Sequence, residues 1–202
     1  MKLYSAAPSP FVRKVRILVM ETGLSDRVEE VDAKITPINP SADLNQANPI
    51  GKIPALATDD GMTLFDSRVI CEYLDTQHRG AKMFPADGAA RWTALRRQAL
   101  ADGVLDAGVN TRYETFLRPE EQRWPEWIDG QKGKIRRGVD ALEAEVDTFG
   151  DTVDIGTIAA ACALGYLDFR FPGDNWRDGH PKLAAWFEAF SARPSMQATV
   201  PA

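Results

Sequence analysis

Apolar and polar positions over the first 80 residues alternate between strand-like and helix-like patterns. Strand-like runs occupy residues 2–5, 27–33, 54–58 and 62–65. Helix-like runs begin after Ser9, after Ser41 and at Asp66. A turn signal, Asp59-Asp60-Gly61, joins the last two strands as a hairpin. This order predicts a small mixed sheet covered by helices, in which the strands on either side of the first helix pair in parallel.

Beyond Gly80 the strand-like patterns stop and helical patterns replace them. Residues 90–117 form one long helical pattern, residues 119–146 form a second that is kinked or begins near Pro125, and two shorter ones follow. Glycine and proline cluster in residues 79–88, where we place the linker. The sequence therefore predicts an α/β domain over residues 1–80 and an all-helical bundle domain over residues 88–202.

Composition and charge narrow the classes of function. The chain has 202 residues, is 44% apolar and carries a net charge of -5, so it has enough apolar material for a sizeable core and no overall attraction for nucleic acid or an anionic membrane. The longest uncharged stretch lies between Asp154 and Asp168 and is too short to span a bilayer. Arg13, Lys14 and Arg16 interrupt the apolar run that a signal peptide needs, and we expect them to form a solvated helix face.

The two cysteines, Cys71 and Cys162, lie inside apolar helical patterns and belong to no C-x-x-C motif. Only His78 and His180 are available as imidazole ligands. We therefore expect a cytoplasmic protein without a metal, in which both cysteines are buried and neither is a nucleophile.

Ser9 and Pro10 stand at the start of the first helix. Serine accepts from exposed backbone N–H groups at such a position, and proline lacks a donor to leave unpaired there, so the pair is a strong capping signal. The same geometry also suits an anion, because a helix start carries partial positive charge and a hydroxyl beside it can hydrogen-bond a thiolate. From the residues alone, both readings stay open.

The stretch NPIGKIPAL, residues 48–56, places Pro54 directly before a strand. A trans proline simply begins that strand. A cis Ile53-Pro54 bond would instead turn the chain and leave the N–H and C=O of Ile53 facing outward, where they could pair with an extended peptide. This stretch alone does not choose between the two.

The stretch FDSRVICEYL, residues 65–74, has Asp66 and Ser67 at another helix start. They either cap the helix or, together with its exposed N–H groups, bind the zwitterionic head of an amino acid. In the second reading the carboxylate holds the ammonium group, and the other donors hold the carboxyl group.

These three stretches, followed by an all-helical second half, resemble the cytosolic glutathione S-transferases, most closely the bacterial branch with an active-site serine. The resemblance covers essentially the whole chain, and the order and spacing of the motifs make it specific. It implies a thioredoxin-like N-terminal domain that binds glutathione, a helical C-terminal domain that lines the second-substrate pocket, and a homodimer. It also implies a role in detoxification, with glutathione as a co-substrate and no cofactor.

The resemblance assigns roles to particular residues. Ser9 matches the catalytic hydroxyl that donates to the glutathione sulfur. The other matching positions bind the tripeptide. The Lys52 side chain meets a carboxylate of glutathione, and the backbone of Ile53, exposed by the cis Pro54, pairs with its cysteinyl part. Asp66 and Ser67 hold the γ-glutamyl head of glutathione. For the second-substrate pocket the candidates are Phe11, Arg112, Tyr113 and Tyr166.

The chain departs from the family pattern at two positions. Asp66 stands where the family more often has Glu, so its contact with the ligand is expected to be longer or bridged by water. Asp154 and Thr157 reverse the usual S/T-x-x-D capping box of the helical domain, and the reciprocal pairing can survive with its partners exchanged.

The leading hypothesis is an enzyme that adds glutathione to small apolar electrophiles. Its rivals are a non-catalytic glutathione-fold binding module and a glutathione-dependent isomerase or peroxidase. Detectable glutathione binding without turnover favours the binding module, and a small panel of electrophiles separates the enzyme classes. The physiological second substrate has no diagnostic motif.

Overall fold

The computed structural model describes residues 1–33 and 35–201, which form two compact units. The first unit contains Met1–Ala86 and the chain from Pro194 onward, and the second contains Asp87–Arg193. The units therefore differ at one end from the sequence-based domains 1–80 and 88–202, since the last residues of the chain group with the first unit.

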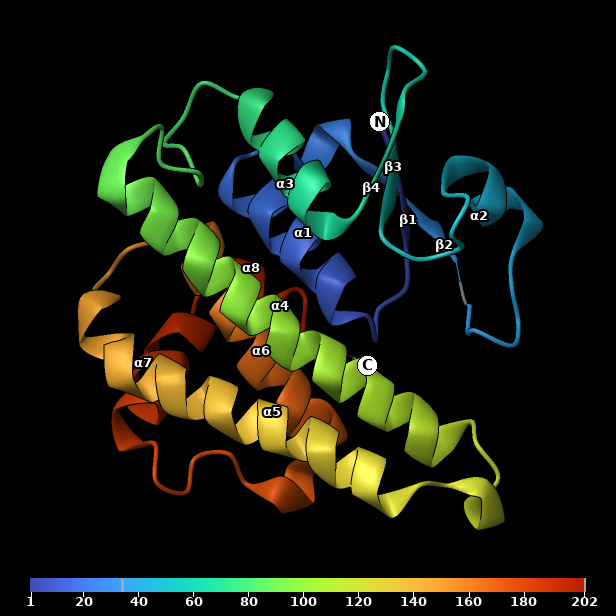
Figure 1. Ribbon diagram of the computed structural model, residues 1–202. Coiled ribbons are helices and arrows are strands. Elements are labelled where there is room, and N and C mark those ends of the chain that lie inside the picture. The colour runs from blue at the N-terminus through green and yellow to red at the C-terminus, as the bar shows by residue number, and fades with distance from the viewer. Residues whose placement is uncertain (34, 202) are drawn as a thin grey trace. The chain divides into compact units, whose positions relative to one another are not determined.

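The first unit is a four-stranded mixed sheet with helices, as predicted (Figure 1). Its strands are β1 (Lys2–Ser5), β2 (Glu29–Asp32), β3 (Ala55–Ala57) and β4 (Thr63–Phe65). Its helices are α1 (Pro10–Glu21), α2 (Ala42–Ala47), α3 (Ser67–Thr76) and α8 (Pro194–Gln197), with a 3-10 turn, η1, at Ser25–Arg27. The strand order is β2-β1-β3-β4, with β1 and β2 parallel and the other two pairs antiparallel. The parallel pairing of the strands that flank α1 is confirmed.

Helices cover both faces of this sheet, with α1 and α3 packed together on one face and α2 on the other (Figure 1). Successive side chains of a strand point to opposite faces. Tyr4 of β1 thus packs against a small cluster of Leu44, Ala47 and Ala55 on the α2 side, and the buried Leu3 points the other way. Each face of β1 is covered, which makes this strand the centre of the unit.

The basic residues of α1 are not a solvated face, which corrects the expectation from the sequence. Arg13 is 6% exposed and Lys14 is 0% exposed. Arg16 is half-buried and pairs with Glu30 at 2.8 Å. None of these three side chains is therefore fully exposed to solvent.

The C-terminal segment belongs to the first unit because it packs against Arg13 of α1. The Arg13 guanidinium donates to the carbonyl oxygen of Met196 at 3.1 Å and to the hydroxyl of Thr199 at 3.4 Å. Nearby, the hydroxyl of Ser195 donates to the carboxylate of Glu21. These contacts link both ends of α1 to a stretch more than 170 positions away in the chain.

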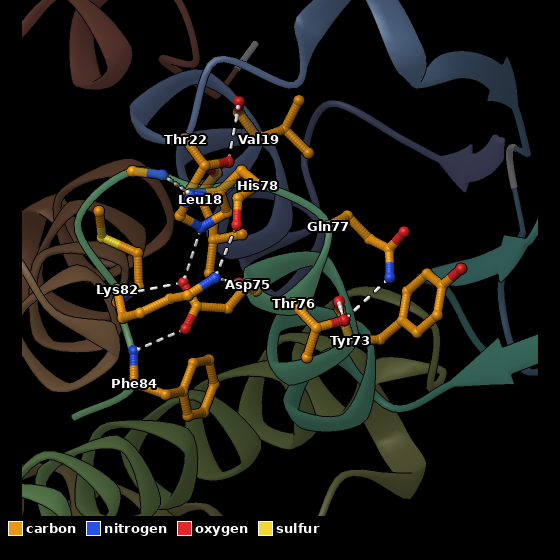
Figure 2. A network of polar contacts seen from close by, with 12 residues as sticks. Leu18, Val19, Thr22, Tyr73, Asp75, Thr76, Gln77, His78, Lys82 and Phe84 are labelled. Atoms are coloured by element: carbon orange, nitrogen blue, oxygen red, sulfur yellow. Dashed lines mark hydrogen bonds and ion pairs between the residues drawn. The ribbon is translucent and has the colours of Figure 1, made fainter. Parts of the chain in front are cut away.

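A buried carboxylate holds the segment that follows α3 (Figure 2). Asp75 is 4% exposed and accepts from the backbone N–H groups of Met83 at 2.8 Å and Phe84 at 3.1 Å, and from Nε2 of His78 at 3.0 Å. The Lys82 ammonium group donates to the backbone carbonyls of Asp75 and His78. We call Asp75, His78, Lys82, Met83 and Phe84 the Asp75 network.

The His78 ring has a defined tautomer within the Asp75 network. Its Nδ1 accepts from the backbone N–H of Gly80 at 3.1 Å, so this nitrogen carries no proton. The proton is on Nε2, which donates to Asp75. The network thus matches donors with acceptors at both ring nitrogens.

The second unit is helical, as predicted. Its helices are α4 (Gly88–Phe116), α5 (Pro125–Glu145), α6 (Ile155–Arg170) and α7 (Pro181–Ser191). Short 3-10 turns lie at Glu120–Gln122 (η2), Val146–Thr148 (η3) and Pro172–Asp174 (η4). Helix α4 packs against both α5 and α6 (Figure 1), and every residue of α6 from Ile155 to Leu167 is buried. Of the two readings for Pro125, the structure has the helix begin there.

A reciprocal capping box begins α6. The Asp154 side chain accepts from the backbone N–H of Thr157 at 2.9 Å, and the Thr157 hydroxyl accepts from the backbone N–H of Asp154 at 3.0 Å. The pairing expected from the reversed motif is therefore present.

None of the helices in the described ranges is both long enough and apolar enough to cross a membrane.

Replacing Gly156 by alanine is expected to lower the free energy of unfolding by about 1–3 kcal/mol, because α4 and α6 approach closely there. A Cβ at Gly156 would lie 2.8 Å from the carbonyl oxygen of Ala94, which is backbone and cannot swing aside. Gly103, in the exposed middle of α4, has no atom within 4 Å of such a Cβ, so Gly103→Ala should stabilise by about 0.5–1 kcal/mol. Urea unfolding followed by tryptophan fluorescence measures both, and a stabilising Gly156→Ala would contradict the close packing.

Candidate functional site

The register of the sheet brings the three sequence motifs to one edge of the first unit. Tyr4 near the end of β1 lies opposite Ala55 at the start of β3, and Ala55 lies opposite Phe65 at the end of β4. The segments that follow β1, precede β3 and follow β4 therefore leave the sheet at the same edge. These segments carry Ser9, Ile53 and Asp66 respectively.

Ser9 caps α1, and its hydroxyl keeps a donor for another group. Its backbone is extended, and Oγ accepts from the N–H of Val12 at 3.3 Å, a long hydrogen bond. A serine hydroxyl has one donor and two acceptor lone pairs. The cap occupies one lone pair and leaves the O–H of Ser9 able to donate to an anion at the helix start.

The Ile53-Pro54 peptide bond is cis, as the resemblance implies. The side chain of Ile53 packs against the cluster of Leu44, Ala47 and Ala55. Its backbone N–H and C=O have no hydrogen-bond partner among the described residues. Both groups are therefore available to a ligand that pairs with this segment like an added strand.

Asn48 organises the loop before Ile53, and sequence analysis did not single it out. It is 1% exposed; its Nδ2 donates to the carbonyl of Lys52 at 2.7 Å, and its Oδ1 accepts from the N–H of Ile50 at 3.2 Å. The N–H of Gly51 donates to the Asn48 carbonyl at 2.8 Å. The only signal in the sequence was the Asn-Pro pair at the start of the loop. The Lys52 side chain is exposed.

Asp66 caps α3 in a strained conformation. Its φ of 67° lies in the left-handed region, and within the described part of the chain no other non-glycine residue has a φ in that region. Such a conformation costs of order 1–3 kcal/mol and is concentrated at functional sites. Its Oδ1 accepts from the N–H of Arg68 at 2.9 Å while the side chain stays exposed, and Ser67 is buried beside it. The exposed carboxylate and the helix start form the pairing expected for an amino-acid head group.

The four second-substrate candidates divide between the units. Phe11 is half-buried in the first turn of α1, with the ammonium group of Lys14 5.8 Å from the ring centroid. Arg112 and Tyr113 lie on α4 and are half-buried, and Tyr166 lies on α6 and is 4% exposed. In the second unit, Arg112 and Tyr166 lie close enough for the charge of each to affect the pKa of the other.

Arg170, in the last turn of α6, belongs to the same environment and was missed from the sequence. Burial is the main cause that raises the pKa of Tyr166, to about 12, and the charges of Arg170 and Arg112 offset part of that effect. Burial also raises the pKa of Tyr113. Both phenols are therefore protonated at neutral pH and can act as donors.

The raised pKa of Tyr166 makes a testable prediction for stability at high pH. Tyrosine in the unfolded chain titrates near pH 10, so above about pH 10 the unfolded state loses this proton before the folded state does. The contribution of Tyr166 to the free energy of unfolding is therefore fully present below about pH 10, and it falls by about 1.4 kcal/mol per pH unit until about pH 12. Tyr166→Phe should lack this part of the decline. Equal pH slopes of the unfolding free energy for wild type and variant would contradict the prediction.

Both cysteines, Cys71 and Cys162, are fully buried, so neither thiol is presented at this site. The arrangement at the sheet edge is instead a hydroxyl donor at one helix start, an unpaired peptide segment, and a carboxylate at a second helix start. Together these groups match an extended peptide with a free amino-acid head and an anionic group near Ser9.

Two family models match the chain. Residues 8–77 match the N-terminal domain of glutathione S-transferases, and residues 125–189 match their C-terminal domain. The chain is 37% identical to the uncharacterized GST-like protein YibF of Escherichia coli (strain K12) over 205 aligned residues, which cover all of this chain and 98% of that protein. The chain therefore belongs to the glutathione S-transferase family.

Solved structures of similar proteins share the fold. A glutathione transferase family member from Pseudomonas fluorescens Pf-5, solved with bound glutathione, is 52% identical with a TM-score of 0.98 and covers 100% of this chain and 98% of its own. A second structure from the same organism, with bound S-(propanoic acid)-glutathione, is 50% identical with a TM-score of 0.93 and covers 100% and 99%. These structures confirm the predicted fold class, a thioredoxin-like α/β unit followed by a helical one.

Proposed function

We propose that this protein is a glutathione transferase that binds glutathione in the first unit and ionises its thiol with Ser9. The observation that carries the proposal is the free O–H of Ser9 at the start of α1, on the same sheet edge as the unpaired backbone of Ile53 and the exposed carboxylate of Asp66. The similar Pseudomonas protein binds glutathione, which supports the same ligand here.

Each group of the tripeptide has a proposed partner. The cysteinyl backbone pairs with the N–H and C=O of Ile53, next to Pro54. The γ-glutamyl head binds to Asp66 and Ser67 at the start of α3, with the ammonium group on the carboxylate. Lys52, exposed on the loop before Ile53, meets a glutathione carboxylate. Glutathione is consumed as a co-substrate, and the proposed reaction needs no cofactor or metal.

The energetics of thiol ionisation are within reach of these groups. A free thiol has a pKa of about 8.5, so only a few per cent is thiolate at neutral pH. Lowering that value by two units requires about 2.7 kcal/mol. One hydrogen bond to a charged group contributes about 1.5–3 kcal/mol, and a helix start adds about 0.3–1 kcal/mol. Ser9 and α1 therefore suffice, and Ser9 remains a neutral donor.

The activated sulfur then attacks a small electrophile. We place Phe11, Arg112, Tyr113 and Tyr166 at the second-substrate site. The binding of S-(propanoic acid)-glutathione by a similar Pseudomonas protein supports a site with room for a group on the sulfur. We further propose that the enzyme works as a cytoplasmic homodimer in detoxification, as the family membership suggests.

A spectroscopic titration tests the proposal directly. Glutathione is added to the wild-type protein at neutral pH, and the ultraviolet absorbance of the thiolate is followed. We expect a thiolate band on binding that is lost in Ser9→Ala while glutathione still binds. A bound sulfur that remains protonated at neutral pH in the wild-type protein would disprove the mechanism. Binding without turnover against any electrophile would favour a non-catalytic binding module.

A further inference from the structure

Asn48 uses nearly all of its hydrogen-bonding groups to hold the turn in which it lies. Its backbone N–H donates to the carbonyl of Leu44 in α2 at 2.7 Å, and its own carbonyl accepts from the N–H of Gly51 at 2.8 Å. In the side chain, Oδ1 accepts from the N–H of Ile50 at 3.2 Å, and Nδ2 donates to the carbonyl of Lys52 at 2.7 Å. At 1% exposure the side chain is too buried to touch a ligand, so any effect on binding passes through the backbone.

The hydrogen bond from Asn48 to Lys52 sets the direction of the peptide group between Lys52 and Ile53. Within the described residues the one cis peptide bond is Ile53-Pro54, so the Lys52-Ile53 bond is trans. In a planar trans peptide group the C=O and the N–H point in opposite directions. Because Asn48 holds the Lys52 carbonyl on the buried side, the N–H of Ile53 points away from that side. This N–H has no hydrogen-bond partner among the described residues.

The side chain of Ile53 holds the same segment from the other end. It packs against the cluster of Leu44, Ala47 and Ala55 on the α2 side of the sheet. The direction of the Ile53 N–H is therefore set before a ligand arrives. A donor that is already oriented loses little freedom on binding, and preorganisation of this kind raises affinity.

We propose that Asn48 is a positioning residue for glutathione, which orients the Ile53 N–H toward the cysteinyl carbonyl of the tripeptide by holding the carbonyl of Lys52. This inference rests on the proposed function, in which the backbone of Ile53 pairs with the cysteinyl part of glutathione. The residues that carry it all belong to the first unit. Asn48 acts on the affinity for glutathione, whereas Ser9 acts on the ionisation of the thiol.

Two substitutions remove the donor of Asn48 in different ways. Asn48→Asp keeps the size of the side chain and an oxygen that accepts from Ile50, but an ionised carboxylate has no donor for the Lys52 carbonyl. Asn48→Ala removes the donor whatever the protonation state of the side chain. In both variants the peptide group before Ile53 is free to turn, and its N–H loses its fixed direction.

Calorimetry measures the expected loss of affinity. Both Asn48 variants should bind glutathione about tenfold more weakly than the wild-type protein, as expected for the loss of roughly one hydrogen bond. The same loss is expected with S-methyl-glutathione, which has no thiol to ionise. With an aryl halide as the second substrate, KM for glutathione should rise by a similar factor. The kcat and the thiolate band at saturating glutathione should stay close to those of the wild-type protein, because Ser9 is unchanged.

Asn45→Asp is the matched control. Asn45 lies on α2 three residues before Asn48, is exposed, and makes no side-chain hydrogen bond among the described residues. The substitution changes the same chemical group and the net charge by the same amount as Asn48→Asp. It should keep the wild-type affinity for glutathione and for S-methyl-glutathione.

Nuclear magnetic resonance tests the contact at Ile53 directly. Labelling the lysine carbonyl carbon with ¹³C and the isoleucine nitrogen with ¹⁵N selects the amides of Lys-Ile pairs, of which the sequence has three, at residues 34–35, 52–53 and 134–135. The signal that is missing in Ile53→Val belongs to residue 53. In the wild-type protein, glutathione should move this amide proton downfield as it gains an acceptor. In the Asn48 variants the shift at saturating glutathione should be smaller.

The outcomes separate the inference from the function on which it rests. An Ile53 amide that saturating glutathione leaves unmoved in the wild-type protein overturns the inference, leaves ionisation by Ser9 untouched, and requires no variant to fold. Unchanged affinity in both Asn48 variants also overturns it. A kcat and a thiolate band that fall together with the affinity would assign to Asn48 a general structural role instead. No binding of glutathione to the wild-type protein overturns the proposed function, and the inference with it.

Discussion

Replacing Ser9 by alanine is expected to slow glutathione conjugation by roughly 10- to 100-fold at neutral pH, with little change in the affinity for glutathione. The reason is that the proposed hydrogen bond from Ser9 to the thiolate, worth about 1.5–3 kcal/mol, is lost, whereas the proposed binding groups at Ile53 and Asp66 remain. The apparent pKa of the bound thiol should rise toward the free value. Initial rates with a generic aryl halide, measured against pH, report both effects.

The dependence on pH has a definite sign. A thiol with a lowered pKa supplies thiolate at neutral pH, and this advantage disappears once free glutathione ionises by itself. The difference between wild type and Ser9→Ala should therefore be largest near neutral pH and shrink above about pH 8.5. A rate deficit that is constant over this range would assign to Ser9 some role other than ionisation of the thiol.

Ser41→Ala is a matched control for the loss of a helix cap. Ser41 caps α2 by accepting from the N–H of Leu44 at 3.3 Å, the same length as the bond from Val12 to Ser9. Each substitution should cost about 0.5–2 kcal/mol of stability. Only Ser9→Ala should affect the thiol, and Ser9→Thr, which keeps both a cap and a hydroxyl, should retain much of the activity. Unchanged turnover in Ser9→Ala would remove Ser9 from the mechanism.

Asp75→Ala should be the most destabilising of the substitutions considered, with a loss of about 3–5 kcal/mol in the free energy of unfolding. It leaves the buried N–H groups of Met83 and Phe84 and the Nε2–H of His78 without an acceptor (Figure 2). Removing one member of a buried charged network costs far more than removing a surface contact, because the remaining polar groups stay buried and unpaired.

The effect of Asp75→Ala must be measured in the first unit. All five tryptophans lie in the second unit, so chemical unfolding is best followed by far-ultraviolet circular dichroism together with tryptophan fluorescence. Thr76→Ala is the control, since Thr76 is the exposed neighbour; its hydroxyl donates to the carbonyl of Tyr73 and accepts from Nε2 of Gln77, both at the surface. It should change stability by no more than about 0.5 kcal/mol. Similar losses in both variants would show that the Asp75 network contributes little.

Periodicity was sufficient to predict the fold because each element has a local cause. The parallel pairing of β1 and β2 follows from a strand, helix and strand in succession, and the helical unit follows from long apolar stripes. The positions of Arg13 and Lys14 could not be predicted in this way. The burial of Arg13 depends on the C-terminal segment, and nothing near it in the sequence indicates that contact.

The candidate site was accessible to sequence analysis in part. The capping signal at Ser9 and the proline after Ile53 are local, and the resemblance to a family gave them roles that their own residues left open. The positive φ of Asp66 was not predictable, since such a φ is uncommon for any non-glycine residue and nothing near Asp66 in the sequence indicates it. Arg170 was missed because its proximity to Arg112 depends on how α4 and α6 pack, which a one-dimensional pattern does not contain.

The return of the chain to α1 after Arg193 has a consequence for how the protein can be divided. The helical unit is an insertion in the first unit, with covalent connections before Asp87 and after Arg193. A fragment that ends before Asp87 would lack the Met196 carbonyl, which accepts from Arg13. It would also expose the Arg13 guanidinium, which is buried in the full chain. Circular permutants that join the termini and open the helical unit would keep the sheet and the segment from Pro194 onward in one continuous piece, and they are the better starting point for isolating the first unit.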